Sequence, residues 1–162
     1  MDPGRLGSRI AKTLTRLLSR KAGPARQGSA YPGDYTGDVD ITYAPHLDGD
    51  ADPGEVVWGW IPYEDDHRRG KDRPSLVIGR DGRWLLVLML TGQDKDRSTS
   101  DDERHEVWVD IGSGSWDRER RPSQVRVDRI IRLDPKAVRR EGAVLDRQRF
   151  EIVAATLRLP RS

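Results

Sequence analysis

Four polar side chains stand where apolar runs of this sequence begin or end, and their types are those of acid–base and phosphate chemistry. Arg73 precedes one apolar run and Thr91 follows the next, while Arg126 and Asp128 share one face of an alternating segment. A guanidinium grips phosphate oxygens with two parallel donors, a hydroxyl can orient a neighbouring group, and a carboxylate can accept a proton. Each also has an ordinary explanation. Arg73 could be a surface charge, Arg126 with Asp128 could be a solvated ion pair, and the threonine could simply end a strand.

Residue content excludes several other chemistries. The chain has no Cys, which rules out disulfides, thiolate nucleophiles and Cys-based zinc sites. None of its three histidines has metal-ligand spacing to another: His46, His67 and His105. The turn at 112–115 lacks the Lys of a phosphate-binding loop, no Gly-x-Ser-x-Gly elbow exists, and Pro53 breaks the calcium-loop pattern of the aspartates before it. We therefore expect no metal and no other cofactor.

The elements that must position the polar side chains are mostly short strands. Apolar or alternating segments predict strands at 55–61, 75–78, 84–90, 106–109, 124–128 and 130–131. Pro62 ends the first of them, and a polar loop is expected to continue through Asp72. Asp81-Gly82 is a two-residue hairpin signal. The unbroken apolarity of 84–90 indicates a strand covered on both faces, either central to the fold or at a subunit contact.

Two helical signals close the domain. Asp134-Pro135 places an N-cap before a proline at the first helical position, which predicts a short turn reaching Arg140. A longer helix is predicted from Asp146, because its apolar residues recur at the spacing of one buried face: Phe150, Val153, Ala154 and Leu157. The predicted fold class is mainly β with α, a small barrel or curled sheet on which this helix packs.

Charge divides the chain into three units. Residues 1–22 form a basic amphipathic arm that suits a membrane surface, RNA phosphates or a partner protein, or is simply a frayed surface helix. Residues 23–53 form an acidic linker rich in Gly and Pro, with six Asp and no Lys or Arg after Arg26. The domain proper spans 54–159 and is nearly neutral.

The arm carries no export or membrane signal. Its apolar positions are interrupted by Lys12 and Arg16, so neither a signal peptide nor a membrane span is predicted. With no Cys in the chain, a reducing compartment is also compatible. We expect a cytoplasmic protein.

The motifs of the domain, in their order, resemble those of the MazF/PemK/Kid family of toxin endoribonucleases from bacterial toxin–antitoxin pairs. The resemblance covers roughly residues 54–157. It rests on five ordered segments: Gly54-Glu55-Val56-Val57-Trp58, Gly70-Lys71-Asp72-Arg73-Pro74-Ser75-Leu76-Val77-Ile78, Thr91-Gly92-Gln93, Pro122-Ser123-Gln124-Val125-Arg126-Val127-Asp128-Arg129-Ile130, and the ending from Gly142 to Leu157. The Arg-x-Asp sequence in the fourth segment is the one found in the Kid-like branch of this family.

This resemblance implies an SH3-like small barrel (MazF/CcdB-like) with a C-terminal helix, which works as a homodimer, is countered by an antitoxin and cuts single-stranded RNA without metal. In such cleavage the 2′-hydroxyl attacks the adjacent phosphate, which needs a base, an acid and a cation. By motif position, Arg73 would be the cation and is also a candidate for the acid, and Thr91 would hold the phosphate or orient the 2′-hydroxyl. Asp128 would be the base and Arg126 a second phosphate clamp. His67, six positions before the first arginine as in the Kid-like branch, is the other proton carrier.

Lys71 and Gln93 lie in the same motifs and are expected to contact RNA. The charged loop at 94–104 is longer than the family pattern, and we expect short-site recognition with local Arg clusters such as Arg118-Glu119-Arg120-Arg121. The six linker Asp could lie over the RNA groove as phosphate mimics, or could simply solubilise the chain.

Two non-enzymatic alternatives share the predicted fold. One is a toxin that poisons DNA gyrase through its C-terminal helix, although this helix lacks the exposed aromatic tail expected for that contact. The other is a catalytically silent SH3-like interaction module, which is favoured if Arg73 and Asp128 point away from one another.

Overall fold

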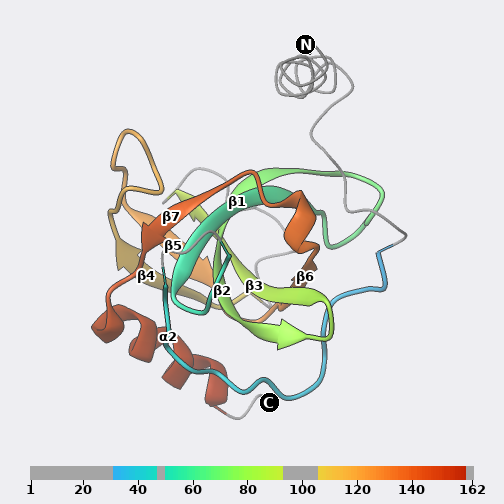
Figure 1. Ribbon diagram of the computed structural model, residues 1–162, viewed down its shortest axis with the longest axis horizontal. Coiled ribbons are helices and arrows are strands. Elements are labelled where there is room, and N and C mark those ends of the chain that lie inside the picture. Colours follow the sequence, from blue (N-terminus) through green and yellow to red (C-terminus); the bar gives the residue numbers. More distant parts are fainter. Residues whose placement is uncertain (1–30, 47–49, 93–105, 160–162) are drawn as a thin grey trace, which may run out of the picture.

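The computed structural model describes residues 31–46, 50–92 and 106–159. Its strands form one curled antiparallel sheet with a helix packed beside it (Figure 1). The elements are β1 (Glu55–Pro62), β2 (Gly70–Asp81), β3 (Trp84–Gly92), β4 (Trp108–Gly112), β5 (Ser123–Arg126), β6 (Ile131–Leu133), the 3₁₀ turn η2 (Pro135–Ala137), β7 (Arg140–Val144) and α2 (Arg147–Arg158). The strand order is β4-β5-β3-β2-β1-β7, and β6 also pairs with β3. The predicted class, a mainly β small barrel with a C-terminal helix, is confirmed.

The β2–β3 hairpin forms where the Asp-Gly signal predicted it. Asp81 pairs with Trp84, so the two-residue turn is Gly82-Arg83. Gly82 has a φ of 62°, a conformation that glycine adopts without the steric penalty of a side chain. β3 then pairs with β2, β5 and β6, and its apolar side chains from 85 to 88 are fully buried. The prediction that this strand is covered on both faces is confirmed, and the strand is central to the fold.

β2 begins earlier than the sequence suggested. Its pairing with β1 continues to Pro62 opposite Gly70, so the connecting loop spans only 63–69. Arg73 therefore lies within the strand, opposite Gly59, and not at the strand start. The predicted strand began after Pro74, at residue 75. This proline is tolerated inside β2 because the pairing with β3 starts one residue later, at Ser75.

The second half of the domain differs from the prediction at four points. β4 begins at Trp108, two residues later than expected, and β5 ends at Arg126. The predicted helical turn after Asp134 forms but ends at Ala137. The chain then enters β7, which the sequence analysis missed because a five-residue edge strand with a charged start shows no clear apolar alternation.

Helix α2 confirms the predicted C-terminal element. The Asp146 carboxylate caps its first turn by accepting a hydrogen bond from the Arg149 backbone N–H. Three of the four predicted apolar positions are buried against the sheet: Phe150, Val153 and Ala154. No helix among the described residues is long and apolar enough to cross a membrane.

Residues 31–46, which we name the strap, lie against the barrel, although the sequence suggested a poorly ordered linker. Figure 1 shows the strap in blue, running past α2. Its apolar side chains pack on the core and are partly buried: Tyr35, Val39, Ile41 and Tyr43. The backbone of Tyr35 bridges to Ile130, and the Tyr43 hydroxyl donates to the Leu145 carbonyl at 2.7 Å. Val39, Ile41 and Tyr43 alternate with polar residues, a pattern typical of a half-buried extended segment that the sequence analysis missed. The basic arm at 1–22 lies outside the described residues.

Candidate functional site

The sheet register brings three of the sequence-predicted residues to one face. Thr91 on β3 is directly opposite Gln124 on β5, and opposite residues of an antiparallel pair point to the same side. Because side chains alternate along a strand, Arg126 shares that side. On the other flank Ser75 is opposite Met89, so Arg73, two residues along β2, shares it too.

On the shared face, the side chains of β2 become more buried from the start of the strand toward its middle. Lys71 at its outer end is exposed and opposite Ile61, Arg73 is half-buried, and Ser75 is fully buried. Thr91 is also buried, with only 4% of its surface exposed. Gln93, the other predicted RNA contact, lies outside the described residues.

Arg126 is the centre of a buried cluster of charges, which we name the Arg126 cluster. Its guanidinium contacts the Asp128 carboxylate at 2.8 Å, Glu64 at 2.9 Å and Glu106 at 3.9 Å. The arginine itself is only 5% exposed, so the solvated face predicted for this strand is wrong at this position. Glu64 reaches it from the 63–69 loop, and Glu106 comes from the segment before β4. Burial lowers the pKa of Arg126, but the bonds to Asp128 and Glu64 outweigh burial, and the net shift is upward.

The Asp128 carboxylate is fully engaged within this cluster. Its Oδ1 accepts hydrogen bonds from the Val107 backbone N–H at 2.7 Å and from Arg126 Nε at 3.0 Å. Its Oδ2 accepts from Nε and Nη2 of the same guanidinium at 3.1 and 2.8 Å. A carboxylate offers about four lone-pair positions. Asp128 thus holds Arg126 in place, with the single Nε hydrogen shared between its two oxygens.

A second buried arginine, three residues further on, forms what we name the Arg129 cluster. Arg129 is held by the strap, since its Nε and Nη2 donate to the two carboxylate oxygens of Asp34 at 2.8 and 3.2 Å. Nη2 also donates to the Pro62 carbonyl at 2.8 Å. The Tyr31 hydroxyl donates to Asp34 Oδ1 at 2.8 Å, and His67 Nε2 lies 3.9 Å from the same oxygen.

The contacts within the Arg129 cluster shift the pKa values of its members. Burial raises the pKa of Asp34, but the hydrogen bond and charge of Arg129 act more strongly together and leave that pKa lowered. Burial raises the pKa of the Tyr31 phenol. The Tyr31 ring also meets the His67 ring edge-on, with centroids 4.8 Å apart. His67 is therefore enclosed by the strap on one side while its side chain keeps 36% of its surface exposed.

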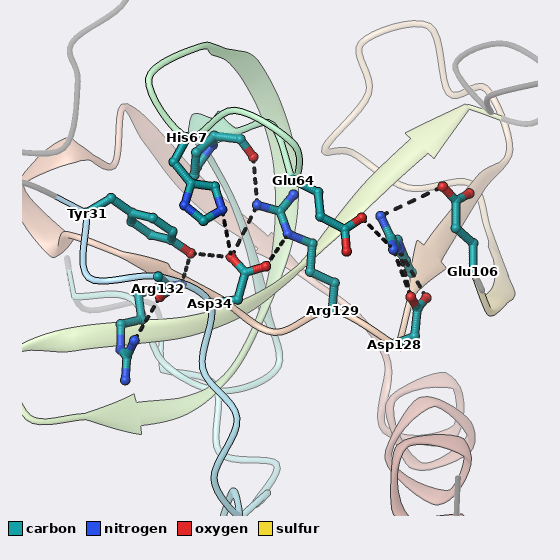
Figure 2. A network of polar contacts seen from close by, with 11 residues as sticks. Tyr31, Asp34, Glu64, His67, Glu106, Asp128, Arg129 and Arg132 are labelled. Atoms are coloured by element: carbon teal, nitrogen blue, oxygen red, sulfur yellow. Dashed lines mark hydrogen bonds and ion pairs between the residues drawn. The ribbon is translucent and has the colours of Figure 1, made fainter. Parts of the chain in front are cut away.

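The two clusters share the segments that supply them. The 63–69 loop contributes Glu64 to the first cluster and His67 to the second, and the chain after β5 likewise contributes to both. Figure 2 shows the Asp34 carboxylate between Tyr31, His67 and Arg129, with the carboxylate of Glu64 turned away toward the other cluster. Among the described residues, no group of three His, Asp or Glu side chains could hold a metal ion.

Sequence reasoning missed several members of these clusters. Glu64 and Glu106 were read only as loop and strand-start charges. Arg129 lies in the fourth resembled segment, but no role was predicted for it. Asp34 was considered only as one of six linker aspartates without a countercharge. The structure corrects that view, since Asp34 pairs with Arg129 and Asp52 lies 3.8 Å from a ring nitrogen of His46.

The fold and the site together define a class of protein. It is a small curled β-barrel with a C-terminal helix and with buried arginines beside one face of the sheet. The model of the PemK-like, MazF-like toxins of type II toxin–antitoxin systems matches residues 52–159. The match covers most of the chain, and the protein belongs to this family of toxins. No curated protein matches the sequence. The matched region starts after the strap, so Tyr31 and Asp34 lie in an extension that precedes the family domain.

Proposed function

We propose that this toxin is an endoribonuclease that cuts single-stranded RNA, with a sequence preference and without metal. The observation that supports the proposal is the shared sheet face of Arg73, Thr91 and Arg126. Two arginines and a hydroxyl on one face suit a phosphodiester, because each guanidinium can offer paired donors to phosphate oxygens. The family membership supports the same reaction class.

In the proposed reaction the ribose 2′-oxygen attacks the adjacent phosphorus, and the bond from phosphorus to the 5′-oxygen breaks. The 2′-hydroxyl proton passes to a base, and the leaving 5′-oxygen takes up a proton from solvent water. The products are a 2′,3′-cyclic phosphate and a 5′-hydroxyl end. Arg73 stabilises the extra negative charge that develops on the phosphate oxygens. Thr91 is buried, and its hydroxyl helps to position the groups of the site that surround that phosphate.

Of the two candidate bases, the geometry favours His67 over Asp128. Asp128 is bound by Arg126 and the Val107 N–H and its side chain is only 14% exposed, whereas the His67 side chain is 36% exposed and lies on a loop beside the site. An imidazole also exchanges protons near neutral pH. We assign Asp128 the role of holding Arg126 and assign Arg126 that of the second phosphate clamp. The exposed Glu64 is the carboxylate that an incoming phosphate displaces.

Cleavage of a mixed-sequence single-stranded RNA in EDTA tests this function. We expect fragments ending in a cyclic phosphate, and we expect Arg73→Ala to lower the rate by roughly 10²–10³-fold, the effect typical of removing one charge-stabilising donor. Arg147→Ala is the matched control, because that arginine is exposed on the distant helix α2 and should leave the rate unchanged. Absence of cleavage by the wild type, or undiminished cleavage by Arg73→Ala, would refute the proposal. Capture of DNA gyrase by a non-cleaving wild type would instead favour the gyrase-poisoning alternative.

We also propose that the toxin acts in the cytoplasm as a homodimer, and that a cognate antitoxin protein neutralises it. Membership of a toxin–antitoxin family supports the antitoxin partner. Light scattering of the purified chain measures its oligomeric state, and a monomeric mass at assay concentration would contradict the dimer. Co-expression with the neighbouring reading frame should relieve growth inhibition if that frame encodes the antitoxin.

A further inference from the structure

The strap places two side chains against the proposed base, although it lies before the matched family domain. Tyr31 packs the edge of its ring against His67, and Asp34 lies within ion-pair distance of His67 Nε2. Asp34 is also the shared partner of Tyr31 and Arg129. Because Tyr31 and Arg129 both hold the Asp34 carboxylate, its position relative to the His67 ring is fixed.

The strap is a permanent part of the site and not a removable cover. The Arg129 side chain is only 3% exposed, and Asp34 is the carboxylate that the structure pairs with it. Detaching the strap would remove this carboxylate and break both of its hydrogen bonds with Arg129, which is unfavourable. Arg132 adds a second anchor, because it donates to the Gly33 carbonyl at 2.7 Å. The strap therefore serves the folded enzyme and does not compete with RNA for these arginines.

We propose that Asp34 is a positioning residue for His67. Building on the proposed function, the carboxylate orients the imidazole and stabilises the ring form with its proton on Nε2, the nitrogen that faces Asp34. Nδ1 is then left unprotonated and is the atom that takes up the 2′-hydroxyl proton. Tyr31 contributes by holding Asp34 through its hydroxyl and His67 through its ring. A partner that fixes the tautomer of a catalytic histidine is a general device of acid–base sites.

The ring tautomer can be measured without any RNA. Nitrogen NMR of the full-length ¹⁵N-labelled protein distinguishes the two ring nitrogens, and with three histidines in the chain the signals can be assigned by substitution. We expect the wild-type His67 ring to be mainly in the Nε2–H form and Asp34→Asn to shift it toward a mixture. Asp40→Asn is the matched control, with the same charge change on an exposed strap residue. A tautomer ratio that Asp34→Asn leaves unchanged would overturn the proposal.

A double-mutant cycle on RNA cleavage tests the functional consequence. We expect Asp34→Asn to lower kcat about tenfold with KM little changed, as a partial loss of general-base catalysis. In a His67→Gln background the same substitution should cause no further loss, because Asp34 acts through His67. Equal losses in both backgrounds would indicate a purely structural role, and faster cleavage by Asp34→Asn would indicate masking. Either result overturns the proposal.

Two measures keep this test separate from folding and from the proposed function. Thermal unfolding identifies any variant that is not folded at the assay temperature. Should Asp34→Asn fail, Tyr31→Phe takes its place in the cycle, since it removes only the hydroxyl that holds Asp34 and keeps the ring. Its loss of kcat should again vanish with His67→Gln. If the wild type cleaves no RNA, the proposed function fails, while the NMR result still decides whether Asp34 orients His67.

Discussion

Arg126 and Arg129 are two buried arginines three residues apart, and they are neutralised in opposite ways. Arg126 has three carboxylates around it, and all of them belong to the matched family domain. Among the described residues, Arg129 pairs with one carboxylate, that of Asp34 in the strap. In the Arg126 cluster, three carboxylates surround one cation, so negative charge is in excess. In the Arg129 cluster, one cation pairs with one carboxylate, and that carboxylate comes from outside the matched domain.

This difference shows that the folded unit is larger than the family domain. A buried cation needs a partner, and for Arg129 that partner lies 95 residues earlier in the chain. The strap adds apolar side chains to the same core cluster that α2 covers. The Arg126 cluster thus lies wholly within the matched region, whereas the Arg129 cluster draws its carboxylate from outside it.

The largest expected effect comes from removing the strap. A chain that begins at residue 50 loses the counter-ion of Arg129 together with the buried surface of four apolar side chains, in sum more than about 5 kcal/mol. That loss is comparable to the whole stability of a typical domain, so we expect the shortened chain to be unfolded or to aggregate at 37 °C. Circular dichroism with thermal unfolding measures this. A chain that begins at Ala30 keeps every described strap contact and is the control. Equal Tm values for the two chains would show that the strap is dispensable.

Next in size is the replacement of Arg126. Arg126→Met leaves the carboxylates of Asp128 and Glu106 buried without their cation, and breaking such a buried pair costs about 3–5 kcal/mol. We expect Arg129→Met to cost less, because it leaves one carboxylate that is more exposed. Urea unfolding of both variants gives the comparison. The reverse order of stability would mean that the excess carboxylates are not held in place by Arg126.

Acid should weaken the Arg129 pair in a defined direction. The pKa of Asp34 is lowered in the folded protein, so its carboxylate contributes stability above the unfolded value of about 3.9 and loses that contribution as the pH falls through the folded pKa. At pH 7 we expect Asp34→Asn to be less stable than the wild type by about 1–2 kcal/mol. Below about pH 4 the difference in unfolding free energy should shrink toward zero. A difference that is the same at pH 7 and pH 3 would contradict an ionic role for Asp34.

The strands and the family could be predicted because they depend on local pattern. Apolar runs, the Asp-Gly hairpin and the Asp146 cap each act over a few neighbouring residues. The hairpin and the cap were found where predicted, and the apolar runs form strands whose ends differ from the prediction by a few residues. The Arg126 and Arg129 clusters depend on pairs separated by 62 and 95 positions, as with Glu64 and Asp34, and no local pattern indicates such pairing. Alternation in 124–128 suggested a wet face, but a loop from elsewhere covers Arg126. The sequence could not predict which side chains are buried by segments that lie far away along the chain.

The smallest effect on stability, and the sharpest on function, should come from Glu64. Its side chain is 55% exposed, so its attraction to Arg126 is screened by water, and Glu64→Gln should leave Tm nearly unchanged. The same substitution removes the carboxylate that competes with an RNA phosphate for Arg126. We therefore expect a non-cleavable single-stranded RNA to bind the variant several-fold more tightly, while Glu119→Gln, which alters an exposed carboxylate in the loop before β5, should bind as the wild type does. Weaker binding by Glu64→Gln would show that Glu64 contacts the substrate itself, and Arg126 would no longer be the second phosphate clamp.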